Sequence, residues 1–313
     1  MISEKSLAPG SRIRMQSHPR GLRGLCRLLG YTAQAYYQYR TTLSRRVLKE
    51  DLLIQQVLHH RRLQPRLGAR KLLVMLQSFM DEHAIYIGRD AFFELLKVNG
   101  LLIRRTRQTR PRTTFSAHWL KKYPDLAAGI KVHRAGQLWV SDITYINLVN
   151  GFAYLSLVTD VHSHKILGYC LSGGLTTEGC ITALQMAVNT RKGYLPLLHH
   201  SDRGTQYCSS AYIKQLNDNN IGISMTQSGN PRDNAIAERV NGILKQELLK
   251  DMYAGLKQAR QAVASAIDIY NRLRPHSSVD MLTPEQAHAK TGEIRRRWKS
   301  YYKTTAKEVY MDG

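Results

Sequence analysis

The sequence contains little cysteine, few acidic residues and no long apolar run, and each shortage excludes a class of protein. Only four cysteines occur among the 313 residues, and none belongs to the C-x-x-C pair of a zinc ribbon or to the dense framework of a disulfide-bonded secreted domain. A transmembrane helix needs about 18 consecutive apolar residues, which the sequence lacks, and Met1–Gly10 has no apolar signal-peptide core. We therefore expect a soluble protein of a reducing cytoplasm.

Acidic residues are half as numerous as basic ones, 23 against 46, which leaves a formal net charge of +23. Such an excess predicts a polyanionic partner, with nucleic acid as the first candidate. The excess is uneven, because residues 1–124 hold 24 basic and 7 acidic residues whereas the rest of the chain is nearly balanced. This asymmetry indicates a nucleic-acid-binding part joined to a part with another task; a merely solubilising surface would mix both signs.

The spacing of apolar residues is helical from the start of the basic part. It predicts a helix that ends at Gly30 and a second one over Ala33–Leu43, with Thr32 as the N-cap. In a helix-turn-helix the second helix would enter a major groove and present Tyr36 and Arg40. An ordinary helical hairpin with an aromatic core face is the alternative. We assign residues 1–48 to this basic N-terminal segment.

A second helical unit is expected over residues 49–103. Its predicted helices span Leu52–Leu63, Gly68–Gln77 and Arg89–Asn99. It is followed at 104–124 by a basic linker that would follow phosphates, because five arginines in nine residues rarely fold by themselves.

The pattern changes to β-structure at about residue 137. Two β-rich runs, Leu138–Val149 and Phe152–Asp160, flank Asn150-Gly151, which predicts a hairpin with a type I′ turn. The further elements expected are a strand over His164–Ser172, a helix over Thr176–Thr190, a strand over Leu195–His199, a helix over Ser209–Asn219, a strand over Ile221–Met225 and a helix over Ala235–Leu249. The order predicts an α/β fold with a mixed sheet of the ribonuclease-H-like kind over residues 125–290, followed by a basic tail at 291–313.

Three carboxylates occupy positions where they need a reason. Asp142 lies in the middle of a predicted strand, Asp202 directly follows another, and Glu238 lies near the start of a helix. Each alone is more often a cap, a turn former or a helix-dipole partner. Together they supply the hard oxygen ligands that suit Mg²⁺ or Mn²⁺. Asp160, a fourth acid at a strand end, is interpreted as structural.

The spacing of these acids is more specific than the acids themselves. Thirty-five residues separate Asp202 from Glu238. Lys245 follows Glu238 by seven positions, which on a regular α-helix is two turns, or about 10.5 Å, along one face. A cation there could hold the phosphate beside the one being cut, although a solvated helix lysine is the simpler interpretation.

The sequence resembles the DDE transposases of the insertion-sequence-three family, relatives of the retroviral integrases. The likeness rests on W-V-S-D-I-T-Y-I at 139–146, H-S-D-R-G-T-Q-Y at 200–207, S-G-N-P-R-D-N-A-I-A-E-R at 228–239, Lys245, Y-N at 270–271, R-P-H at 274–276, T-P at 283–284, R-L-G-A-R-K-L at 66–72 and K-V-N-G-L at 97–101. Two departures are Ser141, where many members have threonine, and Arg239-Val240-Asn241, where a serine and aromatics are common.

The resemblance implies a transposase that nicks transposon ends and joins the 3′-OH to DNA by two-metal-ion transesterification. Asp142, Asp202, Glu238 and Lys245 would be the catalytic residues, with Asp142 bridging two Mg²⁺ ions, for which Mn²⁺ could substitute, and Asp202 and Glu238 completing one ion site each. A catalytically silent DNA-binding regulator and a ribonuclease-H-type nuclease are the alternatives, although all three acids are present.

The resemblance also implies double-stranded DNA partners, namely terminal inverted repeats and target DNA, and a homo-oligomer in the bacterial cytoplasm at the nucleoid. An upstream-reading-frame product, either as a separate partner or as a fusion, could complete the enzyme, because the chain has no sustained leucine-zipper heptad of its own. The residues expected to contact DNA are Tyr36, Arg40, Arg70, Arg89, Arg104, Arg105, Arg107, Arg110, Arg112, Arg203, Asn234 and Lys245.

Overall fold

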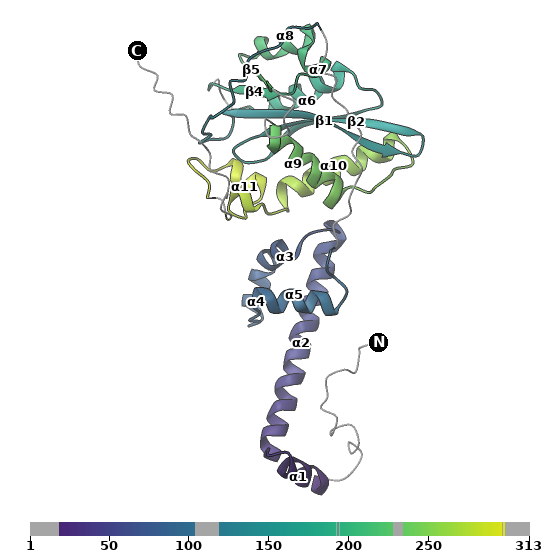
Figure 1. Cartoon of the computed structure of the whole chain (residues 1–313), viewed down its shortest axis with the longest axis vertical. Helices are drawn as coiled ribbons and strands as arrows, with labels where there is room; N and C mark the ends of the chain where they lie inside the picture. The colour runs from purple at the N-terminus through teal and green to yellow at the C-terminus, as the bar shows by residue number, and fades with distance from the viewer. Residues whose placement is uncertain are drawn as a thin grey trace.

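The computed structural model describes residues 19–103, 119–191, 193, 195–227, 234–295 and 297. The arginines of the predicted linker, Arg104, Arg105, Arg107, Arg110 and Arg112, lie outside these residues. The described part contains a helical unit up to residue 103 and a sheet-containing unit from residue 119 onward (Figure 1).

The helical unit begins with the turn that the sequence predicts. Its helices are α1 (Pro19–Leu28), α2 (Ala33–Leu63), α3 (Ala69–Met75), α4 (Gln77–Glu82) and α5 (Arg89–Val98). Between α1 and α2, Gly30 has a positive φ of 73°, and the Thr32 hydroxyl accepts a hydrogen bond from the Ala35 amide at 3.1 Å. The N-cap prediction is confirmed because Thr32 satisfies an amide that the first helical turn leaves without a partner.

Helix α2 corrects the prediction of two separate helices over Ala33–Leu43 and Leu52–Leu63. It is one helix of 31 residues, because residues 44–51 contain neither glycine nor proline to interrupt it. The proposed boundary after residue 48 therefore falls inside a continuous helix. At 1.5 Å per residue the helix is about 46 Å long, and it carries α1 at the end far from the sheet (Figure 1).

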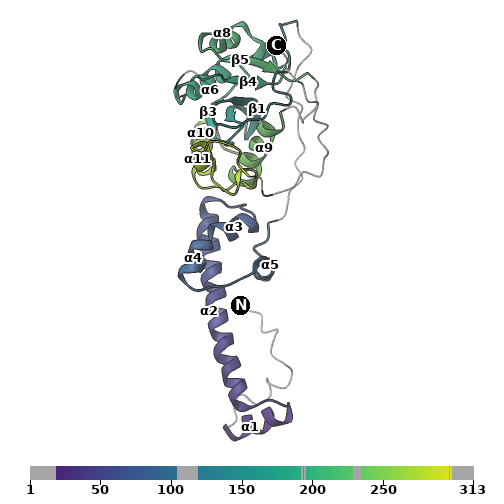
Figure 2. The same ribbon diagram turned by 90° about the vertical axis from the view of Figure 1, so that its left-hand side faces the viewer.

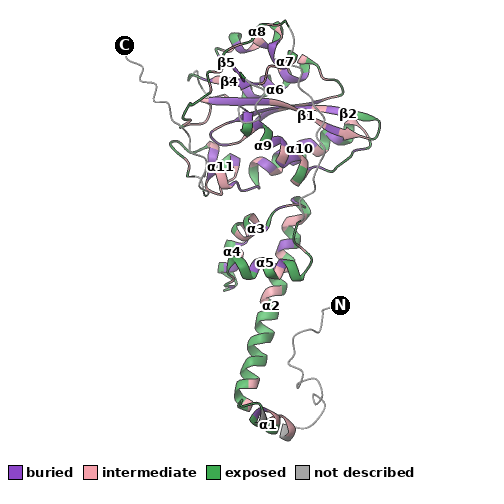
Figure 3. Cartoon of the chain, viewed as in Figure 1, coloured by how far each residue is buried: buried purple, intermediate pink, exposed green. Residues whose placement is uncertain are grey.

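Only the C-terminal half of α2 is packed. Leu53 and Val57 are buried with Leu72, Phe92 and Leu96 in a cluster formed within the helical unit. The N-terminal half of the helix is mostly exposed (Figure 3). The helical unit thus has a core of its own.

The second unit is built on a five-stranded sheet in the order β3-β2-β1-β4-β5. The strands are β1 (Leu138–Leu148), β2 (Gly151–Asp160), β3 (Ile166–Ser172), β4 (Leu198–Ser201) and β5 (Gly222–Met225). β1, β2 and β3 pair antiparallel, whereas β4 pairs parallel with both β1 and β5. This mixed sheet confirms the predicted ribonuclease-H-like fold.

The β1–β2 hairpin is confirmed, but its predicted turn type is wrong. Leu148 pairs with Gly151, which leaves Val149 and Asn150 as the two turn residues. A type I′ turn requires a positive φ at both of them, and neither has one, while Gly151 adopts a φ of 120°. The glycine is therefore needed directly after the turn.

Helices cover both faces of the sheet (Figure 2). α6 (Thr177–Asn189), α7 (Thr205–Cys208) and α8 (Ser210–Asp218) pack on one face around Trp139. α9 (Ala235–Ile243) and α10 (Leu256–Arg272) pack on the other. A π-helical turn, η2 (Leu244–Leu248), continues α9, and the 3₁₀ turn η3 (Ser277–Val279) and α11 (Pro284–His288) follow α10.

Asp160 has the structural role assigned to it. It is fully buried at the end of β2. Its carboxylate accepts hydrogen bonds from the Gly136 amide at 2.8 Å and from the Ser163 amide and hydroxyl at 2.8 and 2.7 Å.

Among the helices in the described part of the chain, none has both the length and the apolar composition to span a bilayer.

Candidate active site

The parallel pairing of β1 and β4 brings Asp142 and Asp202 to the same edge of the sheet. Val140 of β1 lies opposite His200 of β4, and each aspartate comes two residues later in its strand direction. Neighbouring strands lie about 4.8 Å apart, so the two carboxylates meet beyond the carboxyl end of β4. The Asp202 carboxylate accepts the Gly204 amide at 3.0 Å, which fixes it at the start of the loop.

Asn241 fixes the carboxylate of Asp142. The Asn241 amide nitrogen donates to Asp142 Oδ2 at 2.8 Å, and the Ile143 backbone amide donates to Oδ1 at 2.9 Å. The Oδ1 of Asn241 is buried and has no hydrogen-bond partner among the described residues. In the sequence, Asn241 stands out only as a departure from the family pattern; its position three residues after Glu238, on the same helical face, is the signal that marks it as a site residue.

Glu238 acts on Asp142 through its charge. It lies exposed in the first turn of α9, one turn before Asn241. Burial, the charge of Asp202 and the charge of Glu238 raise the pKa of Asp142 to about 7, against the hydrogen bonds from Asn241 and Ile143 that lower it. Within the described residues, however, no three His, Cys, Asp or Glu side chains are gathered closely enough to form a metal-binding group.

Lys245 points back to β1 from the π-helical turn. Its Nζ lies 3.4 Å from the centre of the Tyr145 ring and 3.4 Å from the Thr144 hydroxyl. The expectation of a regular helix over Ala235–Leu249 is therefore wrong after Ile243, where the α-helical pattern ends. Lys245 nevertheless faces the strand that carries Asp142.

The other predicted DNA contacts are distributed over both units. Arg203 lies half-buried next to Asp202. Asn234 is buried, and its amide donates to the Ser141 carbonyl at 2.9 Å, so it fastens the start of α9 to β1.

The helical unit holds the remaining predicted contacts that are described. Tyr36 and Arg40 lie on the N-terminal half of α2, which extends away from the sheet (Figure 1). Arg70 and Arg89 are exposed on α3 and α5, and Arg89 pairs with Asp90 at 2.8 Å. The structure thus brings Asp142, Asp202 and Asn241 together and turns Lys245 toward β1, whereas Glu238 lies exposed nearby and these four residues belong to a separate unit.

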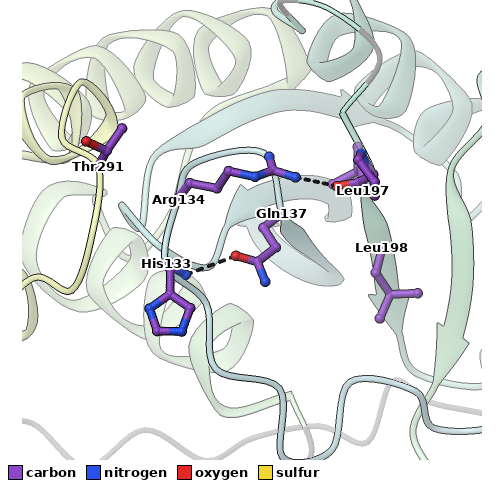
Figure 4. Close-up of a pocket in the computed structure, with 7 residues that line it drawn as sticks. His133, Arg134, Gln137, Leu197, Leu198 and Thr291 are labelled. Carbon is purple, nitrogen blue, oxygen red and sulfur yellow. Dashed lines mark hydrogen bonds between the residues drawn. The ribbon is translucent and has the colours of Figure 1, made fainter. Parts of the chain in front are cut away.

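An open pocket of about 620 Å³ lies at the other edge of the sheet, where β1 and β4 begin (Figure 4). The Arg134 guanidinium donates to the Pro196 carbonyl at 2.8 Å, and the Gln137 side chain accepts the His133 amide at 2.9 Å. These polar groups are engaged in holding loops together. The pocket lies at the end of the sheet opposite to Asp142 and Asp202, and none of the described residues that line it is one of the predicted site residues.

Comparisons with known proteins agree on the second unit. Residues 132–231 match a family described as "Integrase core domain", and residues 219–284 match a second family of the same description. The chain is 32% identical over 265 residues to the 31 kDa protein of insertion element IS600 of Shigella sonnei, which covers 83% of this chain and 96% of that protein. It is 34% identical over 194 residues to the transposase InsF for insertion sequence IS3fB of Escherichia coli (strain K12), which covers 61% of this chain and 67% of that protein. The HTLV-2 integrase catalytic core domain in complex with magnesium matches with a TM-score of 0.40 and 20% identity, over 50% of this chain and 97% of that one.

Proposed function

We propose that this chain, which belongs to the family of insertion-sequence transposases with an integrase core, nicks the ends of its element and joins the freed 3′-OH to target DNA by two-metal-ion transesterification. The observation that carries the proposal is the position of Asp142 inside β1 and of Asp202 directly after the parallel strand β4, with Asn241 holding the first carboxylate. Glu238 completes the proposed D-D-35-E triad. A polynucleotidyl transferase needs such a constellation because its chemistry rests on positioning and charge neutralisation.

The donor atoms suit divalent cations. Asp142, Asp202 and Glu238 offer only hard oxygen ligands, and the pKa of Asp142 is raised by burial and by the negative charge of Asp202, both of which a bound cation would offset. The exposed Glu238 would turn toward the two aspartates when an ion and DNA are present. Two Mg²⁺ ions, or Mn²⁺ in their place, would when bound supply Lewis acidity at the phosphate and acidify an attacking water.

The protein's own residues orient the reactants. Asn241 and the Ile143 amide hold the Asp142 carboxylate in one orientation, which spares the reorganisation of a mobile ligand. Lys245, stacked over Tyr145, would hold the phosphate adjacent to the one being cut. Arg203 would bind a phosphate of the same DNA strand beside Asp202. Asn234 would contribute by fixing the start of α9, because its side-chain amide is already bonded to the Ser141 carbonyl.

The helical unit would bind DNA and deliver it to this edge. We propose that this unit contacts DNA through Arg70 and Arg89 on α3 and α5, and through Tyr36 and Arg40 on the N-terminal half of α2. We further propose that the enzyme works as a homo-oligomer on paired terminal inverted repeats, in the bacterial cytoplasm at the nucleoid, with an upstream-frame product as a partner.

A strand-cutting assay tests this function. Wild type with Mg²⁺, the upstream-frame product and labelled duplex ends of the element that encodes the chain is expected to nick and join them, whereas Asp202→Asn under the same conditions should bind the same DNA and cut at least about 10³-fold more slowly. An RNA–DNA hybrid of the same sequence serves as the alternative substrate. Wild type that binds without cutting would favour a silent regulator, and cutting of the hybrid alone would favour a ribonuclease-H-type nuclease; either result refutes the proposal.

Asn241→Ala should weaken metal use while the protein stays folded. Loss of the hydrogen bond frees the Asp142 carboxylate, so we expect nicking about 10- to 100-fold slower at low Mg²⁺ and a higher Mg²⁺ concentration at half-maximal rate. The measurement is the nicking rate against Mg²⁺ concentration. Asn217→Ala, at an exposed asparagine of α8, is the matched control, and a Mg²⁺ dependence unchanged in both variants would contradict the role of Asn241.

A further inference from the structure

The helical unit contacts the sheet-containing unit, called the catalytic unit from here on, through polar side chains directed at one short segment. Arg66 donates to the Gln246 carbonyl at 3.3 Å and approaches Asp251 at 3.4 Å. Lys71 of α3 lies 3.4 Å from Glu247. The apolar cluster of the helical unit contains no residue of the catalytic unit among the described residues, so these contacts, rather than a shared core, seat one unit on the other.

The receiving carboxylate is held by a buried arginine. Arg274 is 1% exposed, and its Nε and Nη2 donate to the two oxygens of Glu247 at 2.9 and 2.8 Å, while Nη1 lies 2.9 Å from the His276 ring. Burial alone would raise the pKa of Glu247, but Arg274 and Lys71 hold it below its usual value. A buried guanidinium with this fork geometry fixes the carboxylate in one position, because losing the pair would leave an uncompensated charge.

Glu247 and Lys245 belong to the same π-helical turn and point in different directions. Lys245 reaches Tyr145 and Thr144 on β1, and Glu247, two residues later, reaches Arg274 and Lys71. Residues two apart on a helix lie on roughly opposite sides. The turn is thus held from both sides, and π-helical turns recur at functional sites.

The junction beside this turn is not closely packed. A cavity of about 660 Å³ is lined in part by Lys71, Arg239, Arg274 and His276. Among the described residues that line it, Lys71 is the one that comes from the helical unit, and it pairs there with Glu247. Lys71 is therefore placed to affect how the π-helical turn is seated.

We propose that Glu247 is a positioning residue for Lys245, and that Lys71 joins the seating of the helical unit to the catalytic edge through it. Lys71 would hold Glu247 by an ion pair, and Arg274 would fix the same carboxylate from the other unit. Because Glu247 and Lys245 belong to one π-helical turn, DNA held by the helical unit would then be aligned with Lys245. The inference rests on the proposed function in so far as Lys245 holds a DNA phosphate.

Lys71→Gln in the full-length protein tests the chain without removing the buried Arg274–Glu247 pair. We expect end-DNA binding within about threefold of wild type, nicking slower by about 10- to 100-fold, and faster amide hydrogen exchange over Leu244–Leu248. Lys71→Arg should keep the ion pair and stay near wild type in all three measurements. Lys97→Gln, at an exposed lysine of α5 that pairs with Glu94, is the matched control.

A pH profile separates this role from general destabilisation. Burial and the Arg274 charge lower the pKa of Lys71 to about 8; Arg239 also lowers it and Glu247 opposes the shift, while His276 shares the junction. Lys71 is therefore charged at pH 7 and loses its proton as the pH rises through about 8. The gap in nicking rate between wild type and Lys71→Gln should close between pH 7 and pH 9, whereas Lys71→Arg, which stays charged, should keep its advantage at pH 9.

The outcomes distinguish this inference from the proposed function. If wild type neither nicks nor joins DNA, the proposed function fails, and the exchange measurement still decides whether Lys71 holds the π-helical turn. If Lys71→Gln cuts and exchanges like Lys97→Gln, the inference is overturned while the function stands. Loss of DNA binding in proportion to cutting would also overturn it, because Lys71 would then be a direct DNA contact.

Discussion

Asp142→Asn is expected to abolish strand cutting and, at the same time, to stabilise the metal-free protein. The charge of Asp142 is unfavourable in the folded state, because burial and the charges of Asp202 and Glu238 raise its pKa to about 7. The raised pKa means that the folded protein binds a proton that the unfolded chain, with a pKa near 3.8, has released. Stability is therefore lost as the pH rises from about 4 to about 7, and the loss is complete above that range.

Asparagine removes this pH-dependent penalty along with the metal ligand. Because Asp142 keeps some contact with solvent, we expect a gain of about 1–2 kcal/mol at pH 8, or a few degrees in Tm, and little gain at pH 4. Thermal unfolding at both pH values with a chelator present measures this, and single-turnover cutting should fall by about 10³-fold or more. Asp268→Asn, at a largely exposed aspartate of α10, should change neither quantity; a variant at Asp142 that cuts DNA, or that is destabilised at pH 8, would contradict the prediction.

The sequence was sufficient for the sheet and for the edge where Asp142 and Asp202 meet. Alternating and continuous apolar runs identify β1, β2 and β3 because burial on the two faces repeats every second residue. An aspartate inside one strand and another directly after the next parallel strand must then lie at one edge, since both strands point the same way. These patterns depend only on residues close together in the sequence, so they can be read without knowing which distant segments meet.

Features that depend on contacts between distant residues could not be predicted in this way. The π-helical turn after Ile243 carries Lys245 and Glu247, whose side chains contact partners more than 25 residues away on different sides of the turn. The engaged amide of Asn234 and the hydrogen bond from Asn241 to Asp142 join residues separated by more than 90 positions. The junction at Lys71 spans 176 positions. Propensity and periodicity carry no information on such pairs.

The turn between β1 and β2 shows a different limit. Asn-Gly is a strong hairpin signal, but the hydrogen bond from the Val149 amide to the Tyr253 carbonyl at 2.9 Å joins this turn to the segment after the π-helical turn. The turn residues shift by one position relative to the motif, so that Gly151 belongs to β2. The turn type therefore differs from the one that the Asn-Gly pair alone favours, at a turn that is bonded to a distant segment of the chain.

Gly168→Ala is expected to cause the largest loss of stability. Gly168 lies in β3 against α6, and a Cβ added there would stand 1.9 Å from the Ala183 carbonyl oxygen and 2.8 Å from the Ala187 amide nitrogen. Both are backbone atoms of a helix, so no side-chain rotation can relieve the overlap; α6 must move away from the sheet. We expect a cost of about 3 kcal/mol or more, above the usual range for overpacking, measured as a lower urea midpoint.

Gly242→Ala, where nothing lies within 4 Å, is the control and should be neutral or stabilising by up to about 1 kcal/mol because it replaces glycine inside α9. Since β3 is the edge strand farthest from β4 and β5, the Gly168 variant that remains folded should cut DNA at the wild-type rate, and an unchanged urea midpoint would show that the helix and strand are not packed as closely as the backbone distances require.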